Sequence, residues 1–198
     1  MKGCQDLSAS VIAGGLSRRF GSDKTLALLA GKPLIQWVVE GARAYCENLF
    51  VVGKDSFKYS FLKNTPFVKD KYDIQCPMVG LVTIFDHTPA SAVFLISADM
   101  PLFPFAALNE MYEAFKGHDA AVALISGKLY PCAAIYHRRT APIFETMLKG
   151  GDYKLVNAFD KFDTVKLGED LFAPYDKPGL GFINVNTPAE LEYIANKI

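Results

Sequence analysis

The sequence predicts an α/β protein whose sheet is mostly parallel and covered by helices on both faces. Short apolar runs alternate with segments of helical periodicity along most of the 198 residues. Leu7–Ala13 consists of small and β-branched residues and Ala92–Ile96 is apolar throughout, as in strands buried between two layers. Strands that alternate with helices build a mostly parallel sheet, and its ligands lie outside the carboxyl ends of the strands.

The expected strands are short apolar runs, most of them bounded by glycine, proline or charged residues. Gly53 ends the second run and Gly127 lies in a turn between two later ones. Thr164–Leu167 is expected at the edge of the sheet. In chain order the runs are Leu7–Ala13, Leu49–Val52, Phe67–Val68, Ala92–Ile96, Ala120–Ile125, Leu129–Tyr136, Thr164–Leu167 and Phe182–Asn186.

The expected helices show apolar residues at helical spacing or a recognisable start signal. The first begins near Pro33, with Leu34, Val38, Ala42 and Cys46 on one face. The last begins after Thr187, an N-cap that has Glu190 as its capping-box partner. The others are Phe57–Lys63, Pro77–Phe85, Pro104–Phe115, Ala141–Leu148 and Lys154–Phe159, and the last helix covers Pro188–Ile198.

Composition excludes several classes of protein. The 21 lysines and arginines balance 21 aspartates and glutamates, so no overall charge favours nucleic acid or an anionic membrane. The cysteines are scattered without a C-x-x-C pair, which argues against a zinc site or a disulfide scaffold and fits a reducing compartment. No apolar run has the length of a signal peptide or a membrane span. We expect one domain over residues 1–198 and a cytoplasmic location.

A glycine-rich segment follows the first strand: Val11-Ile-Ala-Gly-Gly-Leu-Ser-Arg-Arg-Phe-Gly-Ser-Asp-Lys24. A glycine turn between a buried strand and a helix gathers backbone N–H groups, and Lys24 with the two arginines adds cationic donors. This pattern favours a polyphosphate site over a tight turn with a solvated basic rim. Its spacing matches neither the Walker A motif nor the dinucleotide fingerprint.

Asp70 and Asp99 are expected at the same edge of the sheet as the glycine-rich segment, and Asn184 with Asn186 at the far side of the same crevice. Asp99 directly follows a strand, where a carboxylate suits Mg²⁺, although it can also start a turn or cap a helix. Asp70 also follows a strand, in a charged loop that can simply be solvated. Asn184 and Asn186 alternate on a short apolar run, which places both amides on one face of a strand. They can reach a phosphate, a hydroxyl or metal-bound water, or form a structural turn.

Several motifs together resemble a known family. The segment from Ile12 to Lys24 resembles the nucleotidyltransferase signature L-A-G-G-x-S-x-R-M-G-x-D-K, and Gly31-Lys-Pro-Leu34 follows as in that family. Three later elements resemble the family's C-D-M-P, H-P and N-V-N-T-P-E-E-L elements; they are Ser97-Ala-Asp-Met-Pro101, Tyr130-Pro131 and Asn184-Val-Asn-Thr-Pro-Ala-Glu-Leu191. Over nearly its whole length the chain resembles the molybdenum cofactor guanylyltransferases, also called molybdopterin-guanine dinucleotide biosynthesis protein A.

The resemblance implies a Rossmann-like three-layer sandwich of the nucleotide-diphospho-sugar transferase type. It also implies GTP and Mg²⁺, with Lys24, Asp99 and Arg19 as catalytic residues and Asp99 as the metal ligand. Gly53 stands where the family often has an asparagine near the base. The residues expected to bind nucleotide, phosphate or acceptor are Ile12, Ala13, Gly14, Gly15, Lys24, Gly53, Asp70, Asp99, Asn184 and Asn186.

The reaction that the resemblance implies is transfer of GMP. A terminal phosphate oxygen of molybdopterin is expected to attack the α-phosphorus of GTP, with release of pyrophosphate. Lys24 and Arg18 or Arg19 would offset charge on the phosphates. Cofactor-insertion proteins and molybdoenzyme chaperones are expected partners. The alternatives are cytidylyl transfer to the same cofactor, nucleotidyl transfer to a sugar or polyol phosphate, and a non-catalytic GTP-binding module that regulates a partner.

Overall fold

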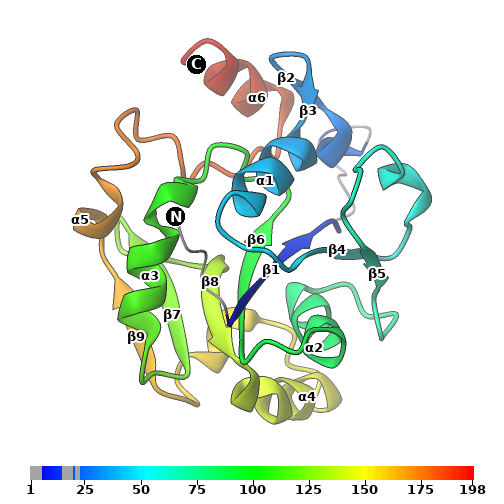
Figure 1. Ribbon diagram of the computed structural model, residues 1–198, viewed down its shortest axis with the longest axis vertical. Helices are drawn as coiled ribbons and strands as arrows, with labels where there is room; N and C mark the ends of the chain where they lie inside the picture. The colour runs from blue at the N-terminus through cyan, green and yellow to red at the C-terminus, as the bar shows by residue number, and fades with distance from the viewer. Residues whose placement is uncertain (1–5, 15–19, 21–22) are drawn as a thin grey trace.

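A computed structural model describes residues 6–14, 20 and 23–198 and contains a central seven-stranded sheet (Figure 1). The spatial order is β5-β4-β1-β6-β8-β7-β9. Only β8 runs against the other six strands of this sheet, because it pairs antiparallel with both of its neighbours. The predicted mostly parallel sheet is therefore confirmed. The strands are β1 (Leu7–Ile12), β4 (Leu49–Gly53), β5 (Phe67–Lys69), β6 (Ala92–Ser97), β7 (Ala120–Ile125), β8 (Lys128–His137) and β9 (Thr164–Leu167).

Helices cover both faces of the sheet (Figure 1). On one face lie α1 (Leu34–Arg43) and α3 (Leu108–Phe115), together with the short α5 (Glu169–Phe172). On the other face α2 (Pro77–His87) and α4 (Ala141–Lys149) lie side by side. The three-layer arrangement expected from the sequence is thus present.

The alternation along β6 explains the two cores. Phe94 and Ile96 point into the core under α1 and α3, whereas Val93 and Leu95 point into the core under α2 and α4. All four side chains are fully buried. A strand that is apolar on both faces is stable only between two layers, which is why its sequence shows no polar alternation.

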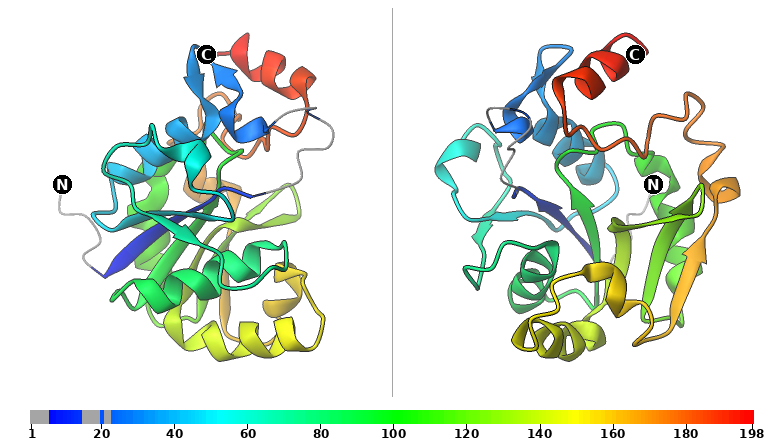
Figure 2. Two further views of the ribbon diagram at one scale, coloured as in Figure 1. Left: turned by 90° about the vertical axis from the view of Figure 1, so that its right-hand side faces the viewer. Right: turned by 180° about the vertical axis from the view of Figure 1, so that it is seen from behind.

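A third, smaller core lies at the carboxyl-end side of the sheet. Helix α6 (Pro188–Ala195) packs there against a two-stranded ribbon formed by β2 (Leu28–Leu29) and β3 (Lys32–Pro33). Ile194 of α6 and Leu29 of the ribbon are buried in this contact. Figures 1 and 2 show α6, in red, beside the blue ribbon, so the last helix of the chain lies next to residues 28–33.

The predicted helices over 57–63 and 154–159 form only 3₁₀ turns, Phe57–Tyr59 and Leu155–Ala158. The predicted helix over 104–115 begins with another such turn, Phe105–Ala107, before α3. Within the described ranges, no helix combines the length and the apolar character that a membrane span requires.

The segment 182–186 is not a strand, so that prediction is wrong. Val185 donates a backbone hydrogen bond of 2.8 Å to the carbonyl of Asp99, beyond the end of β6. Strand β6 already pairs with β1 and β8 along its two edges, and no ladder position is left for a further strand. Asn184 and Asn186 are therefore placed by loop backbone and not by the pleat of a sheet.

Candidate active site

Three side chains from distant parts of the chain meet beyond the carboxyl ends of β1 and β6. The Lys24 ammonium forms an ion pair with Oδ2 of Asp99 and donates a hydrogen bond of 2.7 Å to Oδ1 of Asn186. Only 13% of the Lys24 side chain and 7% of the Asp99 side chain are exposed to solvent. Lys24, Asp99 and Asn186 were each predicted as site residues, and the structure brings them together as one cluster.

Two oxygen atoms beside this cluster are buried without a partner. Oδ1 of Asp99 and Oδ1 of Asn184 accept no hydrogen bond from the described part of the protein. A buried acceptor that is left unpaired costs about 1–3 kcal/mol, so such atoms point to a ligand that would satisfy them. Both are hard oxygen donors of the kind that Mg²⁺ prefers.

The residues present therefore fit a magnesium ion, although they do not form a complete cage. The described residues contain no group of three or more His, Cys, Asp or Glu side chains that could hold a metal. Mg²⁺ usually takes one or two protein carboxylates and completes its shell with water and substrate phosphates. Asp99 and Asn184 offer such a partial set.

A first cavity of about 120 Å³ lies between the ends of β1 and β4 and the start of α2. Two glycines let its walls approach closely: a Cβ atom on Gly53 would lie 2.5 Å from the Ala13 carbonyl oxygen. A Cβ atom on Gly80 would lie 2.4 Å from Cδ1 of Ile12. The lining residues are Ile12, Gly14, Val52, Gly53, Lys54, Asp70, Gln75, Cys76, Pro77 and Gly80.

Asp70 contributes the carboxylate of this first cavity. Its backbone N–H donates a hydrogen bond of 2.8 Å to the Gly53 carbonyl, which fixes it beside the end of β4. Burial raises the pKa of the Asp70 carboxyl, and the charge of Lys54 opposes that rise only in part. A half-buried carboxylate in a cavity is suited to accept hydrogen bonds from a ligand that replaces the lost water.

A second cavity of about 110 Å³ adjoins the first and shares Gly14, Lys54 and Gln75 with it. Its wall is ordered by a hydrogen bond of 3.1 Å between the hydroxyls of Thr25 and Tyr59. The full lining is Ala13, Gly14, Asp23, Thr25, Lys54, Asp55, Lys58, Tyr59 and Gln75. In the chain, Lys24 lies between Asp23 and Thr25 of this lining, which links the ion-pair cluster to the second cavity through the backbone.

Sequence reasoning missed Lys54 and Gln75, which line both cavities. Lys54 directly follows Gly53 at the end of a strand, so the rule that selected Asp70 and Asp99 also applies to it. Gln75 precedes the Cys76-Pro77 start of α2, and its sequence gives no comparable signal.

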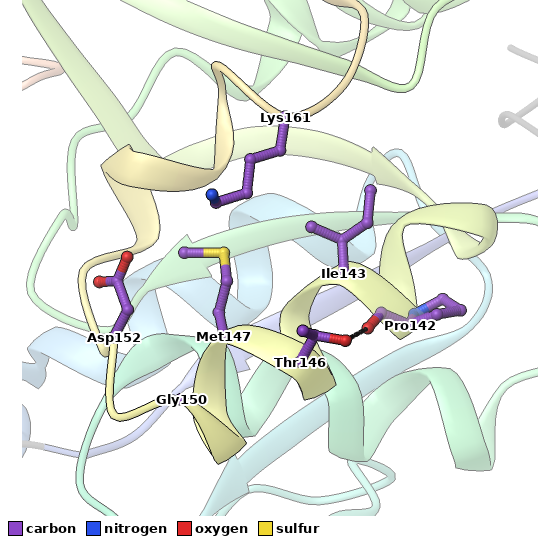
Figure 3. Close-up of a pocket in the computed structure, with 7 residues that line it drawn as sticks. All are labelled: Pro142, Ile143, Thr146, Met147, Gly150, Asp152 and Lys161. Carbon is purple, nitrogen blue, oxygen red and sulfur yellow. Dashed lines mark hydrogen bonds between the residues drawn. The ribbon is translucent and has the colours of Figure 1, made fainter.

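The described residues also line two larger cavities. One of about 640 Å³ is lined by Pro77, Gly127, Lys128, Leu129, Pro131, Cys132, Tyr153, Lys154, Leu155 and Val156. It shares Pro77 with the first cavity and so adjoins the site. The other, of about 530 Å³, lies along α4 and contains none of the predicted site residues (Figure 3).

The structure places most of the predicted site residues in this region. Ile12, Ala13, Gly14, Gly53 and Asp70 line the two smaller cavities, and the others form the cluster or lie beside it. The remaining predictions, Gly15 and Arg19 with its alternative Arg18, lie outside the described residues.

Residues 9–164 match the family described as "MobA-like NTP transferase domain". A relative from Aquifex aeolicus named "Probable molybdenum cofactor guanylyltransferase" is 32% identical, covering 93% of this chain and 88% of its own. One of the same name from a Geobacillus species is 31% identical, covering 95% and 97%.

A solved structure from Archaeoglobus fulgidus, named molybdopterin-guanine dinucleotide biosynthesis protein A, is similar over 96% of this chain and 100% of its own. The TM-score is 0.84 at 25% sequence identity, so the resemblance extends from the loop motifs to the whole fold. The chain belongs to the MobA-like NTP transferase family and is a nucleotidyltransferase.

Proposed function

We propose that this nucleotidyltransferase transfers GMP from GTP to the terminal phosphate of molybdopterin and releases pyrophosphate. The names of its relatives from Aquifex aeolicus and Geobacillus support the acceptor and the base. The observation that carries the proposal is the cluster of Lys24, Asp99 and Asn186, together with the neighbouring second cavity, whose lining includes Lys54 and Lys58. A cation, a carboxylate and an amide at the carboxyl ends of parallel strands are what a polyphosphate site needs.

In this proposal the nucleotide occupies the two smaller cavities. The base and ribose lie against the backbone of Gly14 and Gly53, where the absence of side chains allows close approach. Asp70 accepts hydrogen bonds from the polar edge of the base. The phosphates extend toward Lys24, whose ammonium neutralises part of their charge.

A magnesium ion would be held by Oδ1 of Asp99, with Oδ1 of Asn184 as a second oxygen donor. Oδ2 of Asp99 remains with Lys24, so the carboxylate serves two cations through its two oxygens. The chemistry that Mg²⁺ supplies at such a site is neutralisation of phosphate oxygens and alignment of the leaving group.

The acceptor enters through the cavity of about 640 Å³ that adjoins the nucleotide site at Pro77. Lys128 and Lys154 line it and supply positive charge for a phosphate, and Tyr153 supplies an aromatic face. Molybdopterin carries both a phosphate and a flat ring system, so the lining matches the chemistry of this acceptor.

The chain's own residues then act mainly by positioning. No covalent enzyme intermediate is needed, because the acceptor phosphate is itself the nucleophile. Lys24 stabilises negative charge that spreads over the phosphates as pyrophosphate leaves. Asn186 holds the Lys24 ammonium at a fixed place through its amide oxygen, so that little reorganisation is required during the reaction.

The proposal is tested by pyrophosphate release from the full chain with Mg²⁺, molybdopterin and each of GTP, CTP, ATP and UTP. Among the four nucleotides, we expect pyrophosphate release only with GTP. Release with CTP supports cytidylyl transfer. If release occurs only when a sugar or polyol phosphate replaces molybdopterin, nucleotidyl transfer to that kind of acceptor is supported. GTP binding without release for any acceptor would support a regulatory module and contradict the enzymatic proposal.

The role of Asp99 is tested by Asp99→Asn, which keeps the shape of the side chain and removes its charge. We expect a loss of about 10²- to 10³-fold in kcat with the fold retained. Asp6→Asn is the control, because Asp6 accepts a hydrogen bond of 2.8 Å from the Ser91 backbone at the opposite end of β1. Wild-type kcat in Asp99→Asn would contradict the assignment.

A further inference from the structure

The start of α6 carries one hydrogen bond more than a helix cap requires. Thr187 and Glu190 form a capping box, in which each side chain accepts from the other residue's backbone N–H. The same Glu190 oxygen, Oε2, also accepts from the backbone N–H of Asn186 at 2.7 Å, beside its bond of 2.8 Å to Thr187. A capping box satisfies the helix without that additional contact, so its effect is on Asn186.

Asn186 is held at both ends of its side chain. Its Nδ2 donates to the backbone carbonyl of Asn184 at 3.1 Å, which turns Oδ1 in the opposite direction. That oxygen accepts from the Lys24 ammonium at 2.7 Å. The orientation of the amide is thus determined, and the position of its backbone depends on Glu190.

The surrounding segment has few backbone contacts of its own. Residues 183–186 join no sheet, and Val185 is tied to the Asp99 carbonyl by one backbone bond of 2.8 Å, while its side chain is buried in the third core. Glu190, in contrast, belongs to a helix anchored by the buried Ile194 against the β2–β3 ribbon. The Glu190 carboxylate therefore ties the backbone of Asn186, in an irregular segment, to a packed helix.

Glu190 is in the charged form that this contact needs. Burial opposes its ionisation, but the N–H groups of Asn186 and Thr187, the Thr187 hydroxyl and the charge of Lys24 together outweigh burial, and the pKa of the carboxyl lies below its ordinary value. An ionised acceptor forms stronger hydrogen bonds to backbone N–H groups than a neutral one.

We propose that Glu190 is a positioning residue that fixes Asn186, and through it the Lys24 ammonium, for the transfer reaction. It touches none of the reacting groups itself. The kinetic consequence rests on the function proposed above, whereas the clamp on Asn186 can be observed without it.

Three variants separate positioning from helix capping. Glu190→Ala removes both backbone contacts, and we expect kcat to fall about 10- to 100-fold while the KM for GTP changes little. Glu190→Gln retains an oxygen acceptor and should restore most of that kcat. Thr187→Ala is the matched control, because it removes the two contacts of the Thr187 hydroxyl with Glu190, as acceptor of its N–H at 3.2 Å and as donor to its Oε2 at 3.1 Å, and keeps the Glu190 carboxylate that accepts from Asn186. It should lower the melting temperature, because the helix loses its N-cap acceptor, and leave kcat at the wild-type value.

The kinetic result would overturn the proposal if Glu190→Ala kept wild-type kcat, or if Thr187→Ala lost as much kcat as Glu190→Ala. If the wild-type protein is inactive, that result refutes the proposed function but does not test the clamp on Asn186. A spectroscopic measurement then tests the clamp without enzyme activity. In ¹⁵N–¹H spectra the Asn186 side-chain amide signals should shift in Glu190→Ala and stay in place in Thr187→Ala. Unchanged Asn186 signals in Glu190→Ala would refute the clamp itself.

Discussion

Gly53 offers the sharpest test of how the fold shapes the nucleotide cavity. It is the last residue of β4, and its carbonyl accepts from the backbone N–H of Asp70 at 2.8 Å. The preceding carbonyl, of Val52, accepts from Ala13 at 2.8 Å. A displacement of Gly53 therefore moves Asp70, which lines the first cavity, and Ala13, which lines the second.

Gly53→Ala forces such a displacement. The added Cβ would lie 2.5 Å from the Ala13 carbonyl oxygen and 3.3 Å from the carbonyl carbon. Both atoms are backbone, so no side chain can rotate away. Overpacking of this kind costs about 1–3 kcal/mol. At about 2–4 °C per kcal/mol for a chain of this size, the melting temperature should fall by about 2–12 °C.

The assay combines thermal unfolding with the KM for GTP. Gly168→Ala is the matched control, because a Cβ there meets no atom within 4 Å and the backbone φ is −75°. It should change stability by less than about 1 kcal/mol. In Gly53→Ala we expect a raised KM together with the lower melting temperature. An unchanged melting temperature and KM would refute the reasoning.

Two further predictions concern charged residues, one in a proposed nucleotide cavity and one in the proposed acceptor cavity. Burial raises the pKa of Asp70, so the folded protein retains that proton to a higher pH than the unfolded chain, and stability is lost as the pH rises above the ordinary value of 3.8. Asp70→Asn should therefore raise the melting temperature at neutral pH and weaken GTP binding about tenfold; a melting curve below wild type would contradict this. Lys154→Ala should raise the KM for molybdopterin about tenfold and leave that for GTP unchanged, whereas Lys161→Ala, in the cavity along α4, should alter neither. If both lysine variants changed the KM for molybdopterin equally, the assignment of the acceptor to the cavity lined by Lys154 would be wrong.

Most of the sheet could be predicted from the sequence because each buried strand carries its own signal. Ala92–Ile96 and Ala120–Ile125 are apolar throughout, and the structure contains strands at both places. The β2–β3 ribbon escaped prediction, since each strand has two residues and is stabilised by contact with α6. These two strands are determined by their packing against α6, and their local sequence does not indicate them.

The sequence was sufficient to predict most residues of the candidate site, but not the hydrogen bonds and ion pairs between them. The strand-end rule selected Asp99, and the loop composition selected Lys24, yet neither pattern indicates that the two side chains form an ion pair. Asn186 was expected on a strand and lies in a loop. Its position depends on Glu190, whose sequence signal describes only a helix cap.

The contacts of the candidate site join residues that are far apart in the sequence, and this has a consequence for biosynthesis. Lys24 and Asp99 are 75 positions apart, and Lys24 and Asn186 are 162 apart. Contacts so distant in sequence form late, since a long loop must close first. A nascent polypeptide that has completed β1 through β9 still lacks Asn186 and the α6 anchor. The cluster of Lys24, Asp99 and Asn186 is therefore complete only after the last stretch of the chain has been translated.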